Sequence, residues 1–305
     1  MLKIRKLRQD YRILPKGYYH LCSDGWKDGR LFTGDRQYAA GVTAIAVMTL
    51  KWNIVIYGYV LMPNHIHLLL SGTGEDCVNA FELFLRKCAR WLKNDNCPPL
   101  PDNYGFRLIP VENPESFRSH ILYLARNPYE KGICTPGSYE WGSDYALFSP
   151  ISKRIRGLRA GGLSLKALAR ITDCTERLPD DWEIHPELGI LPGSFVHLDK
   201  VRDLFPSPKA YTSRLVKDYE SLFHISQDLE EDIHLGDEEV DDIYFSQLRR
   251  LFPGKAPRDL SIGEKYRLAT LLAGKYGLTA QQLSRPMHLS ERTITQALNA
   301  KESWG

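Results

Sequence analysis

The fold of this 305-residue chain is decided by Tyr59–Leu70, which reads YVLMPNHIHLLL. The segment belongs to two predicted strands, Asn53–Leu61 and His65–Ser71, both rich in apolar residues. Pro63 stands between them and ends the first strand, because proline has no backbone N–H to give to a neighbouring strand. We therefore expect both strands in one sheet.

Two histidines share one face of the second strand. Side chains at positions i and i+2 of a strand lie on the same side of a sheet. His65 and His67 should therefore project side by side, while Ile66 points to the core. Two imidazoles in this arrangement can share one divalent metal ion. Taken alone, such a pair is more often structural or incidental.

Strand and helix signals alternate along the first 150 residues. Their order, β-α-β-β-α-β-α, predicts an α+β fold, a ferredoxin-like antiparallel sheet with helices on one face. Apolar residues of the second helix recur at intervals of three and four, which is typical of an amphipathic helix. Besides the two strands above, the expected elements are strand Gly17–Ser23, helix Arg36–Leu50, helix Glu75–Asn94, strand Phe106–Val111 and a helix from about Pro114 to Arg126.

The composition is that of a folded globular protein, with 43% hydrophobic and 25% charged residues. The longest apolar runs are far shorter than the roughly 18 to 20 residues that a membrane span needs. The basic N-terminus lacks the apolar stretch of a secretory signal, so we expect a cytoplasmic protein with no membrane partner. The cysteines form no C-x-x-C pair, which argues against a zinc site or a disulfide framework: Cys22, Cys77, Cys88, Cys97, Cys134 and Cys174.

The formal net charge of +3 hides an uneven distribution of charge. Residues 227–245 contain nine acidic residues and no lysine or arginine, which leaves an excess of twelve positive charges elsewhere. A body with such an excess can bind polyanions, including nucleic acid. The acidic run itself is typical of a solvated linker or helix face.

Composition and periodicity divide the chain into three expected domains. They are an α+β domain over residues 1–150, a helical and linker region over 151–250 that contains the acidic run, and a helical unit over 251–305. In the middle region, Arg154–Gly162 is basic and glycine-rich and predicts a loop or linker.

The last 50 residues predict a compact unit of three helices. Capping residues start these helices at Ser261, Thr279 and Ser290. The last two helices, joined by a tight turn, match a helix-turn-helix whose polar recognition helix makes Arg292 and Thr293 candidate DNA-binding residues. A generic three-helix bundle used for protein contact is the alternative.

A second motif lies at the end of the helix that begins near Pro114. It reads YLARNPYEKG over Tyr123–Gly132. Tyr123 and Asn127 are four residues apart and hence neighbours on one helix face, and Pro128 ends the helix nearby. A tyrosine beside an amide oxygen can set a nucleophile next to a metal ligand. A packed tyrosine with an Asn cap at the helix end is the alternative.

Together, MPNHIHLL and the later YLARNPYEKG resemble the motifs of single-tyrosine His-hydrophobic-His transposases, in particular the REP-associated tyrosine transposases. The similarity covers roughly residues 14–150. It implies a metal-dependent single-stranded DNA endonuclease and transesterase of the transposase type. Such an enzyme cleaves through a covalent 5′-phosphotyrosine intermediate and rejoins strands.

Carried over position by position, the resemblance implies that His65, His67 and Asn127 bind Mg²⁺ or Mn²⁺ and that Tyr123 is the nucleophile. The implied partner is single-stranded DNA, with a hairpin or duplex arm, bound by a monomer or homodimer. Three basic residues fall where such enzymes place DNA contacts, although they fit a solvated helix face equally well: Arg86, Lys87 and Arg90.

Two other functions also fit these motifs. A plasmid or phage rolling-circle initiator shares the His-hydrophobic-His core but often carries a second catalytic tyrosine. Tyr129 lies six residues after Tyr123, about 600° of helical rotation, and should not share its face. A catalytically silent DNA-binding regulator would instead use the helix-turn-helix.

Overall fold

The computed structural model describes residues 10–27, 29–217, 219–229, 231 and 235–299. The chain divides into two compact units, Met1–Leu215 and Val216–Gly305. The first unit contains both predicted motifs, and the second contains the three helices with predicted caps. No helix among the described residues is long and apolar enough to cross a membrane.

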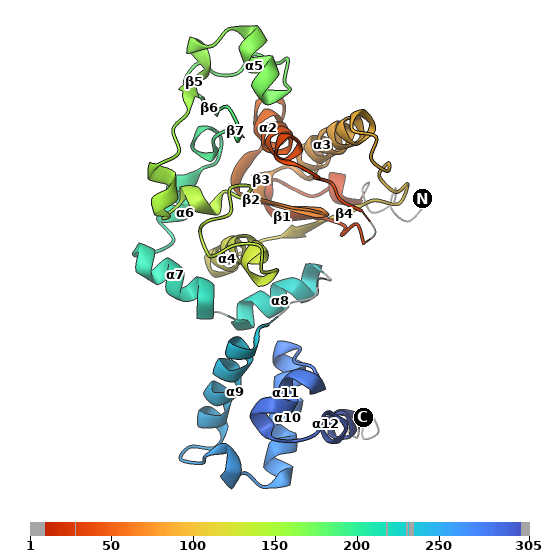
Figure 1. Ribbon diagram of the computed structural model, residues 1–305, viewed down its shortest axis with the longest axis vertical. Helices are drawn as coiled ribbons and strands as arrows, with labels where there is room; N and C mark the ends of the chain where they lie inside the picture. The colour runs from red at the N-terminus through yellow and green to blue at the C-terminus, as the bar shows by residue number, and fades with distance from the viewer. Residues whose placement is uncertain (1–9, 28, 218, 230, 232–234, 300–305) are drawn as a thin grey trace. The chain divides into compact units, whose positions relative to one another are not determined.

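A four-stranded antiparallel sheet forms the centre of the first unit (Figure 1). Its elements and their helices are β1 (Gly17–Ser23), α2 (Asp35–Lys51), β2 (Val55–Met62), β3 (His65–Gly72), α3 (Gly74–Asn94), β4 (Phe106–Pro110) and α4 (Pro114–Glu130). The strand order is β2-β3-β1-β4, so α2 and α3 each connect strands that are not neighbours. The predicted α+β fold with an antiparallel sheet is confirmed, as is the order of its elements.

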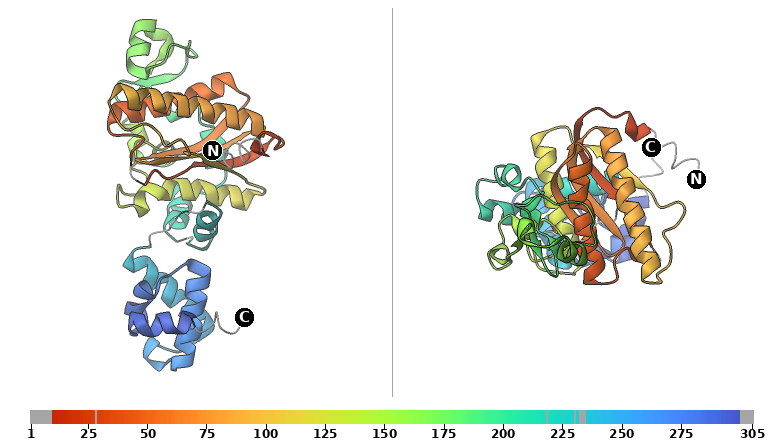
Figure 2. Two further views of the ribbon diagram at one scale, coloured as in Figure 1. Left: turned by 90° about the vertical axis from the view of Figure 1, so that its right-hand side faces the viewer. Right: turned by 90° about the horizontal axis from the view of Figure 1, so that it is seen from above.

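Helices cover both faces of this sheet. Helices α2 and α3 pack on one face and α4 packs on the other, as the left view of Figure 2 shows. The prediction of helices on one face only is therefore wrong. The strands are buried on both faces, because every residue of β2 except Val55 and every residue of β3 except Ser71 is buried. A sheet of this kind needs cover on both sides.

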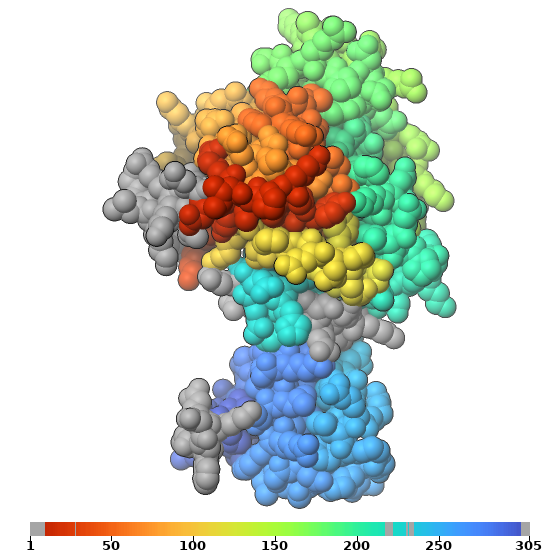
Figure 3. Space-filling model, turned by 180° about the vertical axis from the view of Figure 1, so that it is seen from behind, coloured from red at the N-terminus to blue at the C-terminus, as the bar shows by residue number. Residues whose placement is uncertain are grey.

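Helix α4 lies close to β2 because Gly58 has no side chain. A Cβ atom on Gly58 would come within 3.2 Å of both Ile121 Cδ1 and Leu124 Cδ2. The register between β2 and β3 also shifts between Ile56 and Gly58. In Figure 3, the yellow α4 lies against the red N-terminal segment of the same unit. The absence of a side chain at Gly58 thus permits the close approach of Ile121 and Leu124 of α4.

Helix α4 runs to Glu130, four residues beyond its predicted end at Arg126. The backbone stays helical through Pro128, whose carbonyl accepts a backbone hydrogen bond at 3.0 Å. Arg126 and Glu130 form a buried ion pair one helical turn apart. Arg126 also donates to the carbonyl of Leu215 at 2.8 Å. These contacts anchor the turn of α4 that carries Asn127.

A small accessory layer follows α4 and packs on Ala46 and Val47 of α2. It contains a second sheet of order β5-β6-β7, whose strands of two or three residues are too short for hydrophobic periodicity to reveal. One of them lies in the predicted loop Arg154–Gly162. The elements are η1 (Asp144–Ala146), η2 (Pro150–Lys153), β5 (Leu158–Arg159), η3 (Ala160–Gly162), α5 (Leu165–Thr172), β6 (Glu183–His185), β7 (Gly189–Ile190), η4 (Pro192–Ser194), α6 (Leu198–Arg202) and α7 (Pro208–Lys217).

The second unit is helical. It comprises α8 (Tyr219–Leu229), α9 (Asp237–Leu251), η5 (Pro257–Asp259), α10 (Ile262–Tyr276), α11 (Ala280–Met287) and α12 (Glu291–Asn299). The predicted caps are confirmed, because the side chains of Ser261, Thr279 and Ser290 accept backbone hydrogen bonds at 3.3, 3.2 and 3.1 Å. Helix α10 ends at Gly277, whose φ of 63° is a left-handed value that glycine adopts without strain.

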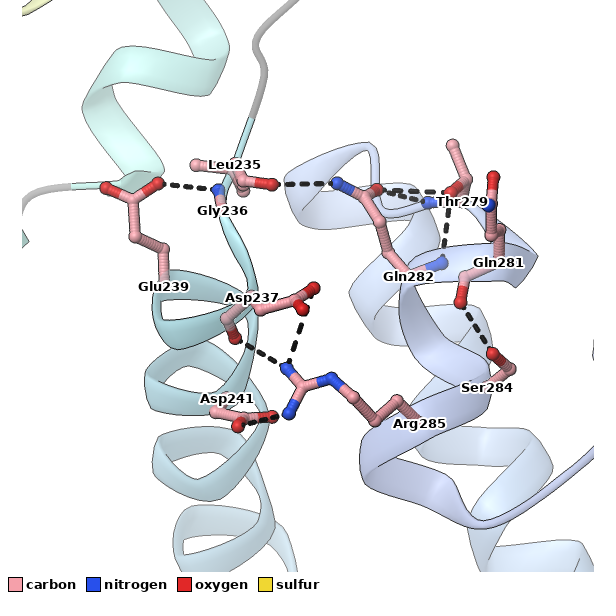
Figure 4. Close-up of polar contacts among 10 residues, drawn as sticks. All are labelled: Leu235, Gly236, Asp237, Glu239, Asp241, Thr279, Gln281, Gln282, Ser284 and Arg285. Atoms are coloured by element: carbon pink, nitrogen blue, oxygen red, sulfur yellow. Dashed lines mark hydrogen bonds and ion pairs between the residues drawn. The ribbon is translucent and has the colours of Figure 1, made fainter. Parts of the chain in front are cut away.

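Part of the acidic run forms the start of α9. Asp241 and Asp237 hold Arg285 of α11, which donates to the Asp241 carboxylate at 2.8 Å and to the Asp237 carbonyl at 2.7 Å (Figure 4). The Glu239 carboxylate accepts from the Gly236 N–H at 2.9 Å. Acidic side chains in a first helical turn are also favoured by the positive end of the helix dipole. This part of the run is therefore a helix face.

Candidate functional site

Strand β3 places two histidines on the sheet face that α4 covers. The ring centroids of His65 and His67 lie 4.9 Å apart, with the rings nearly perpendicular. Ile66 is fully buried, and its backbone N–H donates to Ser23 Oγ at 2.9 Å. His65 is 8% exposed, whereas His67 has no exposed surface. The pair therefore offers two imidazoles on one side of the sheet.

Helix α4 brings Tyr123 and Asn127 to the same place. The amide nitrogen Nδ2 of Asn127 donates to His67 Nε2 at 3.2 Å. The ring centroid of Tyr123 lies 5.6 Å from that of His67. The structure thus brings together around His67 the four side chains for which the sequence predicts metal binding and nucleophilic attack.

Two further histidines belong to this site, and the sequence analysis missed both. His20 of β1 has its Nε2 3.1 Å from His67 Nδ1, and its Nδ1 lies 2.7 Å from Nδ1 of His120 on α4. His20 is fully buried and His120 is 3% exposed. The spacing of three residues between His120 and Tyr123 indicates a shared helix face. His20 gives no comparable signal, because its place beside His67 depends on the register of β1 with β3.

With the nitrogen of the Asn127 amide facing His67, the hydrogen bonds assign the protons to the ring nitrogens. Asn127 donates to His67 Nε2, so that nitrogen is unprotonated and the proton of His67 is on Nδ1. His67 Nδ1–H then donates to His20 Nε2, and His20 donates from its own Nδ1 to His120 Nδ1. The hydrogen bonds are therefore donated in one direction, from Asn127 through His67 and His20 to His120.

Burial keeps these histidines neutral. It lowers the pKa of His67 to about 3, with smaller contributions from the charges of His120 and Lys131. Burial also lowers the pKa of His120 to about 4. The pKa of His20 lies well below its ordinary value, because of burial first and the neighbouring imidazoles second. At neutral pH each ring is therefore in the form that binds metal ions.

The donor atoms of the site fit a small divalent cation. His65 Nδ1 donates to the side-chain oxygen of Asn64 at 2.8 Å, so His65 Nε2 carries a lone pair. The Asn127 oxygen Oδ1 is buried and has no hydrogen-bond partner among the described residues. Such an atom costs about 1–3 kcal/mol, which a bound cation would offset. Mn²⁺ and Mg²⁺ accept an amide oxygen, and imidazole nitrogens favour Mn²⁺ of the two.

Cys22 lies close to the same group of donors. It stands opposite His67 in the register of β1 with β3, and its Sγ lies within 4.8 Å of a ring nitrogen of His67. Sulfur ligands favour softer cations such as Zn²⁺. Together with the lone pairs described above, this makes the surroundings of His67 a candidate metal site.

The predicted DNA contacts of α3 lie away from this site. Helix α3 covers the opposite face of the sheet, where Arg86 and Arg90 are exposed and Lys87 is half-buried. Arg90 forms an ion pair with Asp173 at 2.9 Å. The three basic residues border a hollow of about 330 Å³. The structure does not bring them together with the histidines.

The predicted DNA contacts of the second unit lie on α12. Arg292 is exposed and makes no ion pair or hydrogen bond with the described residues. Thr293 is half-buried, and its Oγ1 lies 2.7 Å from Ser290 Oγ at the cap of the helix. Gln296 and Asn299 are exposed at four and seven residues after Arg292, which places all three on one face.

Comparisons with known proteins add a distant likeness. No family model matches the chain, and no curated protein matches it. Among solved structures it is similar to a REP-associated tyrosine transposase bound to a REP hairpin, at 16% sequence identity and a TM-score of 0.38. The match covers 45% of this chain and 82% of that one. At this distance the likeness carries no functional argument, so function rests on the geometry of the site.

Proposed function

We propose that this protein is a metal-dependent single-stranded DNA endonuclease and transesterase of the transposase type, with its catalytic domain in residues 1–150. The observation that carries the proposal is the buried Oδ1 of Asn127, which has no hydrogen-bond partner in the described part of the chain. Asn127 contacts His67 and lies one helical turn from Tyr123. Phosphoryl transfer to tyrosine requires a phenol next to side chains whose lone pairs can bind a metal ion.

Tyr123 supplies the nucleophile in this proposal. A phenol has an ordinary pKa near 10, so it attacks only when its proton is removed or the developing charge is stabilised. Its oxygen forms a bond to the scissile phosphorus, while the bond from phosphorus to the 3′ oxygen breaks and that oxygen takes up a proton. The 5′ phosphate of the DNA stays joined to Tyr123. A later 3′-OH can therefore reverse the step and rejoin strands without ATP.

His65, His67 and Asn127 hold Mg²⁺ or Mn²⁺ in this proposal. When bound, the ion stabilises negative charge on a non-bridging oxygen of the scissile phosphate. His67 keeps its Nε2 unprotonated for this role, although in the metal-free chain that lone pair accepts the Asn127 N–H. Metal binding would therefore turn the Asn127 amide, so that its oxygen, which has no partner among the described residues, replaces the N–H on this side. The burial of these groups excludes water and so strengthens their electrostatic effect.

The recessed position of the site supports single-stranded DNA as the substrate. Tyr123 is 5% exposed and His67 is fully buried. A duplex holds its phosphates on a stiff, wide cylinder, whereas a single strand can bend toward a recessed group. Basic residues elsewhere on the first unit would contact the rest of the DNA, including Arg86, Lys87 and Arg90.

We assign binding of a duplex arm to residues 251–305. A turn of three residues, which starts at His288 with φ of 52°, joins α11 and α12. This supports a helix-turn-helix with α12 as the recognition helix. Arg292 carries a charge that would neutralise a DNA phosphate, and Gln296 and Asn299 are of the residue types that read adenine in the major groove. Thr293 would support the start of that helix.

The exposed face of α12 also supports a second candidate function, a DNA-binding regulator without catalysis. A rolling-circle initiator is less well supported. Its usual second tyrosine would have to be Tyr129, which is half-buried six residues after Tyr123 and so lies on another side of α4.

Strand cleavage of labelled hairpins tests these functions. The wild-type chain is incubated with Mn²⁺ and a hairpin whose single-stranded flank carries a label at its 3′ end. We expect the label to migrate with the denatured protein, because the cleaved 5′ phosphate remains on tyrosine, and we expect EDTA to prevent this. Binding of the duplex arm without cleavage would favour the regulator, and attachment through Tyr129 would favour the initiator.

A further inference from the structure

A chain of hydrogen bonds runs behind the proposed metal ligands. It links Asn127 Nδ2 to His67 Nε2 at 3.2 Å, His67 Nδ1 to His20 Nε2 at 3.1 Å, and His20 Nδ1 to His120 Nδ1 at 2.7 Å. All four side chains are buried. Of these four side chains, the proposed reaction uses Asn127 and His67, so it leaves the buried His20 and His120 without a function.

The proton position on His67 decides whether that ring can bind a cation. A neutral imidazole carries its proton on either nitrogen, and the hydrogen bond of one nitrogen selects the state of the other. The acceptor Nε2 of His20 selects the form of His67 that is protonated at Nδ1. Without that acceptor, the proton could move to Nε2 of His67, where the Asn127 oxygen would accept it. His67 Nε2 and the Asn127 oxygen would then no longer be able to bind the cation.

We propose that His20 and His120 are positioning residues that keep His67 Nε2 unprotonated, the state that binding of a divalent cation requires. This inference rests on the metal site of the proposed function. His20 acts directly on His67. His120 acts through His20, because its Nδ1 accepts the His20 Nδ1–H and so leaves His20 Nε2 as the acceptor. Partners of this kind change metal affinity by about 10–100-fold.

The test must separate the shape of His20 from its hydrogen bonds. Its ring packs edge-on against His67 and Tyr123, with centroids 5.2 and 5.9 Å apart. His20→Phe keeps a ring of similar shape and removes the acceptor. His20→Gln loses the ring and keeps an acceptor oxygen that can reach His67 Nδ1. A purely structural role predicts that Phe is tolerated better, whereas the positioning role predicts that Gln is.

Nitrogen NMR of the metal-free, full-length chain reads the proton position directly. The signals of His67 are identified by their loss in His67→Gln. We expect a proton on Nδ1 in the wild type and in His20→Gln, and a shift of that proton toward Nε2 in His20→Phe. His185→Gln is the control, because the hydrogen bonds that His185 accepts from described residues come from the nearby backbone of Glu187 and Leu188. It should leave the His67 signals unchanged.

Calorimetric titration with Mn²⁺ measures the consequence for metal binding. We expect His20→Phe to weaken Mn²⁺ binding by about 10–100-fold and His20→Gln to restore it. His120→Phe should cause a smaller loss, and it carries the same test if His20→Phe does not fold. A folded His20→Phe with an unchanged proton position and unchanged Mn²⁺ affinity would overturn the inference.

The two measurements separate this inference from the proposed function. A wild-type chain that binds no Mn²⁺ would overturn the metal-dependent function. The NMR signals of the metal-free chain would still show whether His20 selects the proton position of His67. Mn²⁺ binding and DNA cleavage by the wild type, together with full Mn²⁺ affinity of His20→Phe, would overturn the positioning role alone.

Discussion

The buried site around His67 and the exposed face of α12 present polar side chains in opposite ways. Around His67, each ring is held by partners from other elements, and His20 and His120 are 100 residues apart in sequence. On α12, Arg292 and Gln296 extend into solvent without a hydrogen bond to any described residue. The buried side chains therefore depend on one another, whereas Arg292 and Gln296 of α12 are independent of their neighbours.

This difference predicts where function and stability are coupled. Removal of one partner from a buried network leaves another polar group unsatisfied, which costs about 1–3 kcal/mol. Substitutions on an exposed surface usually change stability by less than about 0.5 kcal/mol. Substitutions around His67 should therefore affect folding and chemistry together. Substitutions on α12 should affect DNA binding alone and should combine additively.

The largest effect is expected from Tyr123→Phe, which removes only the phenolic oxygen. Covalent attachment to DNA should disappear, while hairpin affinity measured by fluorescence anisotropy should stay nearly unchanged because the ring remains. Tyr129→Phe is the matched control on the same helix and should retain attachment. A denaturation-resistant adduct formed by Tyr123→Phe would contradict the assignment of the nucleophile.

The next largest effect is expected from His65→Ala and His67→Ala. Each should slow cleavage by about 10²-fold or more and weaken Mn²⁺ binding, because charge stabilisation at phosphorus is lost. His67→Ala should also lower the free energy of unfolding by about 1–3 kcal/mol more than His65→Ala, because it removes the donor to buried His20 Nε2 and the acceptor of Asn127 Nδ2. Cleavage rates and urea unfolding measure the two effects. Wild-type rates in both variants would show that the pair is structural.

The buried histidines should make the metal-free chain sensitive to acid. The pKa of His67 is about 3 and that of His120 is about 4 in the folded state, both below the ordinary 6.5. The unfolded chain therefore binds more protons below pH 6.5, and stability falls as the pH drops. Each of the two should cost about 1.4 kcal/mol at pH 5.5 relative to neutral pH.

Urea unfolding at pH 7.5 and 5.5 measures this loss, and tryptophan fluorescence follows it because five of the six tryptophans lie in the first unit. His120→Gln should lose less stability on acidification than the wild type. Asp144 acts in the opposite direction, because burial raises its pKa to about 6 and the folded state gains a proton as the pH falls. Asp144→Asn should therefore show a steeper loss. An equal pH dependence in the wild type and His120→Gln would refute this role of His120.

The smallest effect is expected on α12. Arg292→Gln should lower the slope of log affinity against log salt by about 0.9 on a substrate with a duplex arm, because one phosphate contact is lost. Cleavage of a short single strand should not change. Arg285→Gln is the matched control, because Asp241 and Asp237 already engage that guanidinium. Identical salt slopes in the wild type and Arg292→Gln would favour a protein-contact role for α12.

The two regions also differ in how far the sequence predicts them. On the second unit, the caps at Ser261, Thr279 and Ser290 are local signals, and the structure confirms them. In the first unit, the strand spacing of His65 and His67 is equally local. The contribution of His20 could not be predicted, because it needs the register between β1 and β3, which is set by tertiary packing.

The layers of the first unit show the same limit. Strands rich in apolar residues indicate burial on both faces of a sheet. They do not indicate which helix covers the second face, so the position of α4 could not be predicted. The strands of the accessory sheet, such as β5 (Leu158–Arg159), are too short to show a period. Their pairing depends instead on packing against α2.

The missing side chain at Gly58 restricts how this protein can evolve. Ile121 and Leu124 lie within 3.2 Å of the place that a Cβ would take, and Tyr123 stands between them on α4. A residue larger than alanine at position 58 would force the side chains of Ile121 and Leu124 to move, and with them the packing of the helix that carries Tyr123. Natural variants should therefore carry a larger residue at position 58 only where position 121 or 124 has become smaller. An alignment of homologous chains could instead show large residues at position 58 without smaller residues at 121 or 124. That result would show that the spacing between α4 and the sheet is not restricted by Gly58.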